Sequence, residues 1–130
     1  MSYSNAMEVL HAWMGGVNGG QIDDVLGLYA DGAVLLPTFS PHAITTEEMR
    51  RRYFEQLGAR PGLNVSLHQR TVREQPLAGS LRVISGIYCF RMEIDGELLG
   101  FEARFSYVVD PGASRPILHH HSSQIPRNLS

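Results

Sequence analysis

Residues 81–109 (LRVISGIYCFRMEIDGELLGFEARFSYVV) decide the fold, because they have the pattern of two long strands joined by a tight turn. Asp95 and Gly96 lie at the centre, and both residues tolerate the positive φ that a two-residue hairpin turn requires. In the second strand, apolar side chains recur at every other position from Phe101 to Val109, which puts them on one face of a sheet. The stretch therefore predicts an antiparallel hairpin with one buried face.

The rest of the chain places this hairpin in an α+β domain. Period-two patterns predict strands near residues 64–74, 81–94, 97–109 and 115–124, and a short strand at 33–36 that ends at Pro37. Apolar spacings of three and four predict helices before them: one at 7–17, weakened by Gly15-Gly16, one at 22–29, and one that begins with a Thr45/Glu48 capping box and ends at Gly58. Helices first and strands later indicate that helices cover one face of a curved antiparallel sheet.

Composition limits the classes of function. At 130 residues the chain suits a single domain, residues 1–130, with residues 1–6 expected to be disordered or foreign to the native protein. The chain contains no lysine, which excludes Schiff-base chemistry and a Walker-type phosphate loop. One cysteine, Cys89, excludes an internal disulfide and any multi-cysteine metal site.

Charge and hydropathy limit the partners. The net charge is −2, and Arg50, Arg51 and Arg52 spread around a helix as a solvated face, so nucleic acid is not an expected partner. No apolar run approaches the ~20 residues that span a bilayer, and no secretory signal is present, so we expect a cytoplasmic protein that does not bind membranes.

The run His119-His120-His121-Ser122-Ser123 crowds polar side chains into an expected strand. Strand alternation puts His119, His121 and Ser123 on one face, and this face is the one we expect to line a pocket. Zinc is the rival interpretation, since His119 and His121 could share an ion with His68 from another strand. The pattern lacks a carboxylate to orient the imidazoles, so we expect neither a metal nor another cofactor.

Several motifs follow one another in a familiar order: Leu28-Tyr29-Ala30-Asp31, Ala33-Val34-Leu35-Leu36-Pro37-Thr38, Tyr53-Phe54, Gly86-Ile87-Tyr88-Cys89-Phe90, Ala103-Arg104-Phe105, and His119 to Pro126. Over residues 7–127 the chain resembles an NTF2-like (SnoaL-like) domain. More narrowly, it is similar to the branch related to the association domain of calcium/calmodulin-dependent kinase II, and within that branch to the iota-class carbonic anhydrases.

The resemblance implies a cone of helices wrapped by a strongly bent sheet, usually dimeric, with a pocket between the two. It implies reversible hydration of carbon dioxide, in some members without metal, by hydroxyl side chains that position water and bicarbonate. The matching positions are Thr38, Tyr53 and Ser123, and Tyr88, Phe90 and His119 are expected to contact substrate. His121 is our candidate proton shuttle, because imidazole is the side chain suited to accept a proton near neutral pH.

Other functions remain open. Taken singly, Thr38 could cap a turn, Tyr53 could fill the core, and Ser123 could bond a neighbouring carbonyl. The aromatic strand faces also suit a noncatalytic NTF2-like protein that binds a small apolar ligand or assists a biosynthetic system. A SnoaL-like cyclase or isomerase is a third possibility, although the predicted strands offer no well-placed Asp as a base. We expect a carbonate dehydratase that acts on a small molecule as a homodimer.

Overall fold

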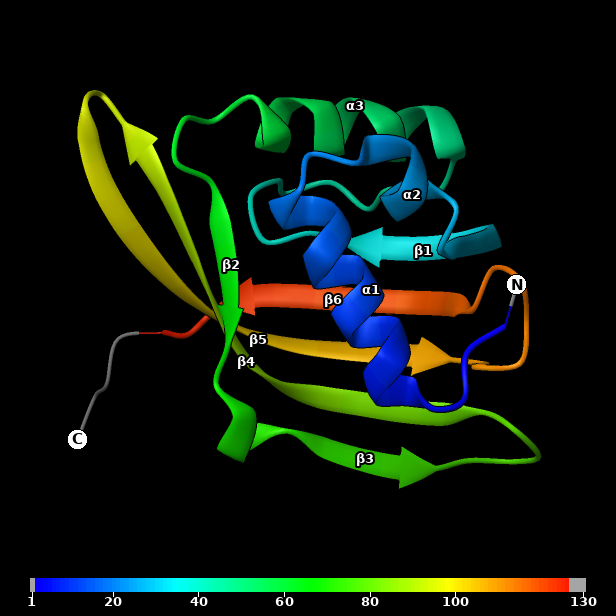
Figure 1. The fold of residues 1–130 in the computed structure, drawn as a ribbon. Helices are drawn as coiled ribbons and strands as arrows, with labels where there is room; N and C mark the ends of the chain where they lie inside the picture. Colours follow the sequence, from blue (N-terminus) through cyan, green and yellow to red (C-terminus); the bar gives the residue numbers. More distant parts are fainter. Residues whose placement is uncertain (1, 127–130) are drawn as a thin grey trace.

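The computed structural model describes residues 2–126, in which three helices cover one face of a strongly bent six-stranded sheet (Figure 1). The strands are β1 (Tyr29–Leu36), β2 (Asn64–Leu67), β3 (Arg73–Pro76), β4 (Arg82–Ile94), β5 (Glu97–Val109) and β6 (Ile117–Gln124). Their order is β1-β6-β5-β4-β2, and β3 also pairs with β4. The β1–β6 pair is parallel and the others are antiparallel. The predicted α+β class is confirmed.

The β4–β5 hairpin is the longest element and confirms its prediction. The two strands pair from Arg82↔Val109 to Ile94↔Glu97, and the turn between them has φ of 52° at Asp95 and 79° at Gly96. The expected strand at 64–74 was wrong in one respect. The short 3-10 helix η1 (Gln69–Thr71) interrupts it, so that β2 and β3 pair with different parts of β4.

The first two helices pack tightly against each other. Helix α1 (Ala6–Asn18) begins at the side-chain cap Asn5 and continues through Gly16, where a Cβ atom would lie 2.7 Å from a methyl group of Val25. Gly16 therefore permits helix contact instead of weakening the helix end. Helix α2 (Ile22–Leu26) is shorter than expected, because Tyr29 begins β1.

Helix α3 (Glu47–Gly58) forms the rim of the cone (Figure 1). Its N-cap is Thr46, whose hydroxyl accepts a 3.2 Å hydrogen bond from Met49 N–H, so the predicted cap at Thr45 was off by one residue. The helix ends at Gly58 as predicted, but the expected left-handed stop is wrong, since Gly58 has no positive φ and the C-cap Ala59 is right-handed.

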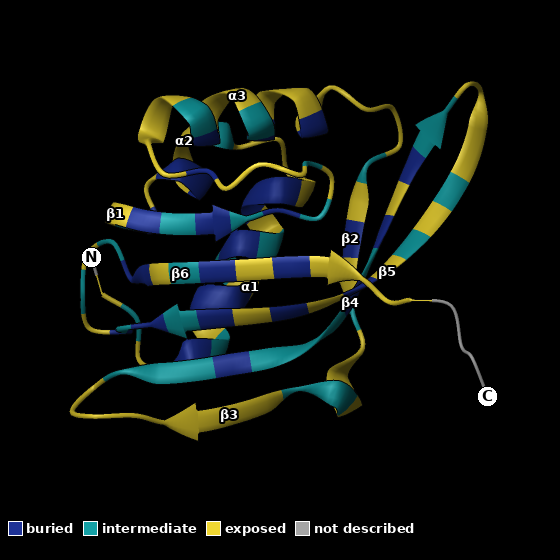
Figure 2. Cartoon of the chain, turned by 180° about the vertical axis from the view of Figure 1, so that it is seen from behind, coloured by how far each residue is buried: buried dark blue, intermediate teal, exposed yellow. Residues whose placement is uncertain are grey.

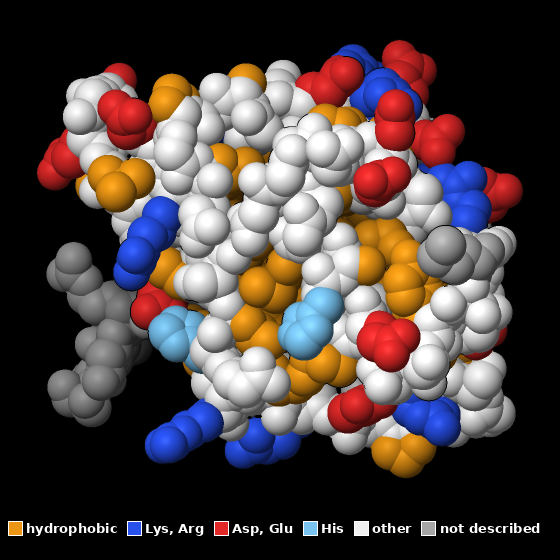
Figure 3. Space-filling view, in the orientation of Figure 1, with side chains coloured by type: hydrophobic (Ala, Val, Ile, Leu, Met, Phe, Trp, Pro, Cys, Tyr) orange, Lys and Arg blue, Asp and Glu red, His pale blue; other side chains and the backbone are white. Residues whose placement is uncertain are grey.

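The three consecutive arginines of α3 do not share one solvated face. Arg50 is 1% exposed, and its guanidinium donates a 3.1 Å hydrogen bond to the carbonyl of Ala33. Arg51 and Arg52 are exposed and pair with Asp23 and Glu48. Figure 3 shows acidic and basic side chains intermixed where α3 begins, with no basic stripe on this face.

The face assignment predicted for β6 was wrong, and a β-bulge explains it. Ile117 pairs with Val109 and His119 pairs with Val108, so Leu118 is an extra residue that shifts the alternation by one. Beyond the bulge, His120 and Ser122 face the helices, and Figure 2 shows buried and exposed bands alternating along the strand.

The buried interior lies between the inner face of the sheet and the helices. Helix α1 crosses that face, and Trp13 contacts rings from α3, β4, β5 and β6. None of the helices within residues 2–126 is long and apolar enough to cross a membrane.

Candidate functional site

A small enclosed space lies under Trp13, and four of the seven predicted site residues line it. Thr38, Tyr53, Tyr88 and Phe90 meet there from the end of β1, from α3 and from β4. The volume is about 10 Å³, which is room for a single water-sized molecule. The polar wall is completed by His120 and Ser122.

His120 is a deeply buried polar group of this wall, at 2% exposure. The hydroxyl of Tyr29 lies 2.8 Å from its Nδ1, and the hydroxyl of Tyr88 lies 3.1 Å from its Nε2. Tyr107 stacks on the imidazole at 3.8 Å between ring centroids, and Trp13 meets it edge-on at 5.3 Å. Burial lowers the pKa of His120 well below its ordinary value, and the adjacent His119 and His121 add to this effect, so His120 is neutral.

Hydroxyl groups make up the rest of the polar wall. Thr38 and Ser122 hydrogen-bond through their hydroxyls, and Tyr53 accepts a 3.4 Å hydrogen bond from the backbone N–H of Phe39. Burial raises the pKa of Tyr53 and of Tyr88, so both phenols keep their protons near neutral pH. The wall therefore offers neutral hydrogen-bonding groups with no fixed charge.

The remaining predicted site residues lie on the other side of β6. His121 and Ser123 are exposed, and His119 is half-buried on the same outer face. The expectation that this face lines the inner pocket is corrected: the bulge at Leu118 turns it outward. His121 and Ser123 instead line a surface depression of about 350 Å³, which also reaches His42.

Thr38 and Ser122 lie between the inner space and the surface depression. Both residues line the inner space and also the surface depression that contains His121. A hydroxyl pair at this position separates a buried imidazole from an exposed one.

A larger hollow of about 490 Å³ lies on the other side of Tyr53. It is bounded by α3, by the loop after β1 and by the end of β4. Tyr53 and Leu57 line both the hollow and the inner space, so their side chains form the partition between them. Phe39 stands beside this partition, 36% exposed, with edge-on contacts to Phe90 and Phe101.

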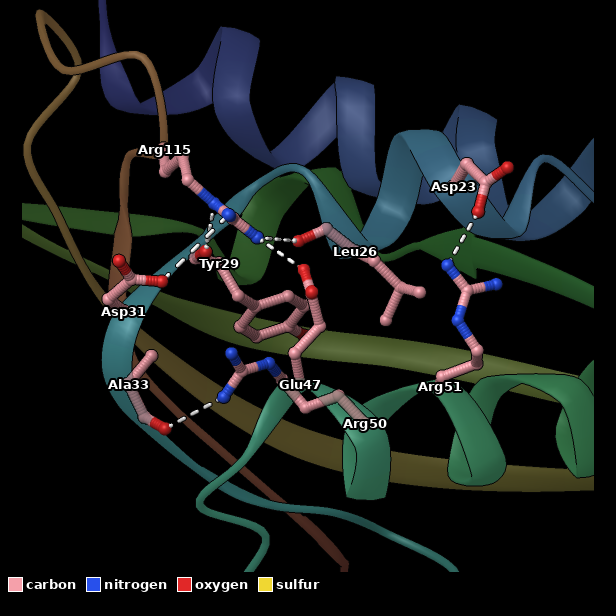
Figure 4. Close-up of polar contacts among 9 residues, drawn as sticks. All are labelled: Asp23, Leu26, Tyr29, Asp31, Ala33, Glu47, Arg50, Arg51 and Arg115. Carbon is pink, nitrogen blue, oxygen red and sulfur yellow. Dashed lines mark hydrogen bonds and ion pairs between the residues drawn. The ribbon is translucent and has the colours of Figure 1, made fainter.

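Tyr29 is held at its backbone carbonyl by Arg115 and contacted on its ring by Arg50 (Figure 4). Arg115 donates to the carbonyl of Tyr29 at 2.7 Å, to the carbonyl of Leu26 at 3.1 Å and to the Glu47 carboxylate at 2.8 Å. The Arg50 guanidinium lies 5.6 Å from the centroid of the Tyr29 ring, within the range of a cation–π contact. Two of the described buried side-chain atoms lack a hydrogen-bond partner, Nε of Arg50 and the hydroxyl of Tyr107.

Four residues of this site were not predicted from the sequence: Trp13, Tyr29, His120 and Ser122. The apolar face of β5 carried one usable signal, since Tyr107 and Phe105 lie opposite His120 and Ser122 in the antiparallel ladder. Nothing in the sequence pattern indicated the bulge in β6 that places these residue pairs opposite each other.

The zinc alternative finds no support in the geometry. Nε2 of His68 lies 2.7 Å from a carboxylate oxygen of Glu102, away from His119 and His121. Within residues 2–126, no three His, Cys, Asp or Glu side chains are grouped closely enough to hold a metal ion.

Comparisons with known proteins bear on the fold. The chain matches no family model and no curated protein. Among solved structures, it is similar to a calcium/calmodulin-dependent protein kinase II association domain from Xanthomonas campestris, with 23% identity, a TM-score of 0.83, and coverage of 98% of this chain and 99% of that one. The fold is NTF2-like.

Two further structures show the range of proteins with this fold. A protein from Streptomyces avermitilis, named as a dehydratase of the NTF2-like family, has 12% identity and a TM-score of 0.79, and the match covers 95% of this chain and 96% of that one. A ketosteroid isomerase-like protein from Erwinia carotovora has 11% identity and a TM-score of 0.75, with coverage of 93% and 94%. At these identities the likeness concerns the fold alone.

Proposed function

We propose that the chain hydrates carbon dioxide in the inner space without a metal, as the resemblance to iota-class carbonic anhydrases implies. One observation carries the proposal: an enclosed, water-sized space is walled by the neutral hydroxyls of Thr38, Tyr53 and Ser122 and by the neutral pair Tyr88–His120. A space of this size holds one water molecule, and its lack of charged groups suits an uncharged second reactant. Tyr53 and Leu57 would give way toward the outer hollow to admit carbon dioxide.

The hydroxyls would act on both reactants. A water molecule held by the Thr38–Ser122 pair forms a bond from its oxygen to the carbon of carbon dioxide, and one C=O electron pair moves onto oxygen. The phenols of Tyr53 and Tyr88 would donate to the oxygen that gains charge, which is stabilisation of the oxyanion-hole type. Loss of one water proton then leaves bicarbonate. Since water alone is a poor nucleophile, its orientation and the removal of this proton limit the rate.

The proton would leave through the hydroxyl pair to the outer side of β6. Thr38 and Ser122 reach the surface depression where His121 and His42 are exposed to solvent. Imidazole exchanges protons readily near neutral pH, so His121 keeps its proposed role as a proton shuttle, now from outside the pocket. Ser123 has no role in this scheme.

Stopped-flow measurement of carbon dioxide hydration tests the proposal. Purified protein treated with chelator is expected to accelerate hydration above the buffer rate, and added zinc should not increase the rate. A rate equal to that of buffer contradicts the proposal, and activity that requires zinc contradicts its metal-free form.

A second candidate function rests on the outer hollow. Its volume of about 490 Å³ suits a metabolite, and its lining combines apolar side chains with Arg52, Arg60 and His42 and includes no carboxylate. A noncatalytic protein that binds a small apolar carboxylate there is the alternative. Thermal-shift measurements with aliphatic and aromatic carboxylates test it. Stabilisation that is lost in Arg60→Gln and kept in Arg70→Gln favours it, since Arg70 lies outside the hollow.

The proposal includes a homodimer, as the family resemblance implies, and a cytoplasmic location, as the sequence predicts. Sedimentation equilibrium measures the oligomeric state, and cell fractionation measures the location. A monomer at micromolar concentration would contradict the expected oligomer.

A further inference from the structure

A series of buried hydrogen bonds begins at Trp13, and the donor in the first of them is fixed. Trp13 Nε1–H lies 2.9 Å from the hydroxyl oxygen of Tyr29. An indole N–H can donate a hydrogen bond and cannot accept one. Tyr29 is therefore the acceptor in this bond, and its own phenolic proton must go elsewhere.

That proton has one acceptor within reach. The Tyr29 hydroxyl lies 2.8 Å from Nδ1 of His120, and no other acceptor among the described residues hydrogen-bonds with it. The nearby Arg50 guanidinium can only donate. A buried hydroxyl that donates to nothing loses a hydrogen bond without compensation from water, so Tyr29 donates to Nδ1.

We infer that Trp13 and Tyr29 are positioning residues that hold His120 as the neutral tautomer with its proton on Nε2. Nδ1 accepts from Tyr29, and Nε2–H then donates to the Tyr88 hydroxyl at 3.1 Å. Burial keeps this imidazole uncharged. The arrangement is rigid, because Arg115 and Arg50 fix Tyr29 (Figure 4). In addition, Trp13 stacks on Tyr88 with ring centroids 5.7 Å apart.

The direction of these hydrogen bonds determines which groups can donate inside the enclosed space. Tyr88 accepts from His120, so its own proton points away from the imidazole. The hydroxyls of Thr38 and Ser122 also lie within reach of that proton. Tyr53 accepts from Phe39 N–H and has its proton free to donate. His120 is then a fixed donor and does not receive the water proton. The consequence for catalysis rests on the proposed function, whereas the tautomer does not.

Nitrogen NMR on the full chain measures the tautomer directly. With ¹⁵N-labelled histidine, the ring nitrogens of His120 are assigned by the signals lost in His120→Gln. The expected result is a protonated Nε2 and an unprotonated Nδ1, unchanged between pH 6 and pH 8. A proton on Nδ1, a mixture of the two tautomers, or a charged ring overturns the inference, whether or not the protein hydrates carbon dioxide.

Replacing the Trp13 side chain by 3-benzothienylalanine tests the cause. This residue keeps the bicyclic shape and has sulfur in place of N–H. Tyr29 is then free to accept from Nδ1–H, so the Nδ1–H tautomer of His120 should become detectable. The exposed His121 serves as the internal control, with no change expected. An unaltered His120 tautomer in the folded variant would show that Trp13 does not set it.

Kinetic measurements distinguish a positioning role of Trp13 from a purely structural one. If the proposed function holds, the benzothienyl variant should lose on the order of tenfold in kcat/KM at every pH, as expected when the orienting partner of a site residue is removed. Unchanged kcat/KM in an active enzyme contradicts the catalytic consequence. If the native enzyme is inactive, the proposed function fails, and the NMR result still decides the tautomer.

Discussion

The two faces of β6 carry the same residue types in neighbouring positions and have different chemistry. On the inner face, His120 and Ser122 are 2% and 3% exposed and are held by Tyr29, Tyr88 and Thr38. On the outer face, His121 and Ser123 are exposed to solvent. Residue type therefore does not explain why the inner face of β6 forms a site and the outer face does not. The difference comes from desolvation and from the hydrogen-bond partners that hold the inner groups.

Paired serine variants should give the largest contrast between the faces. Ser122→Ala removes the partner of Thr38 in the inner wall, so we expect kcat/KM for carbon dioxide hydration to fall about a hundredfold, the usual cost of one lost oxyanion-type or water-orienting group. Ser123→Ala is the matched control and should stay within about twofold of native, well below the effect of one lost site group. Stopped-flow kinetics measures both, and equal losses in the two variants would place the chemistry elsewhere.

Paired histidine variants compare the faces by stability. His120→Gln leaves the hydroxyls of Tyr29 and Tyr88 without their common partner in a buried position, so unfolding free energy should fall by about 2 kcal/mol. The exposed His121→Gln should change it by less than about 0.5 kcal/mol. Urea denaturation followed by circular dichroism measures the difference. A loss at His121 as large as that at His120 would contradict the assignment of faces.

His121 should matter for proton transfer rather than for stability. In dilute buffer, His121→Ala is expected to lower kcat on the order of tenfold with little change in KM, because a general acid–base group is lost outside the binding space. Added imidazole should restore the rate. Failure of imidazole rescue, or a change in KM alone, would rule out the shuttle role.

The pH dependence of stability should come from the inner histidine. Burial lowers the pKa of His120, so below about pH 6.5 the unfolded chain binds a proton that the folded chain does not. Stability is therefore complete above that pH and is lost on acidification, by up to about 1.4 kcal/mol per pH unit from this group. Urea titrations between pH 7.5 and 5 should show the slope in native protein and in His121→Gln and a smaller slope in His120→Gln. Equal slopes in all three would contradict a neutral buried His120.

Much of the fold could be predicted because it depends on local pattern. The Asp95-Gly96 turn requires positive φ at two successive residues, and few sequences other than this one favour it. The predicted alternation of apolar and polar side chains in β5 is observed, with the apolar face buried from Ala103 to Val109. Both features depend on neighbouring residues only.

The site was only partly predictable because its decisive features are non-local. Thr38, Tyr53 and Tyr88 were identified through the resemblance and do meet. The inner face of β6 depends on a bulge at Leu118, which only the pairing with β5 defines. Likewise, Arg50 is buried because β1 offers the Ala33 carbonyl to it, and the sequence of α3 contains no trace of that contact.

A crystal structure of the protein in concentrated bicarbonate would test the central claim most directly, that the inner face of β6 forms the functional site. The account predicts an anion in the space under Trp13, with its oxygens about 2.7 to 3.2 Å from the hydroxyls of Tyr53 and Ser122. An anion bound instead beside His121 and Ser123, with the inner space unoccupied by it, would contradict that claim.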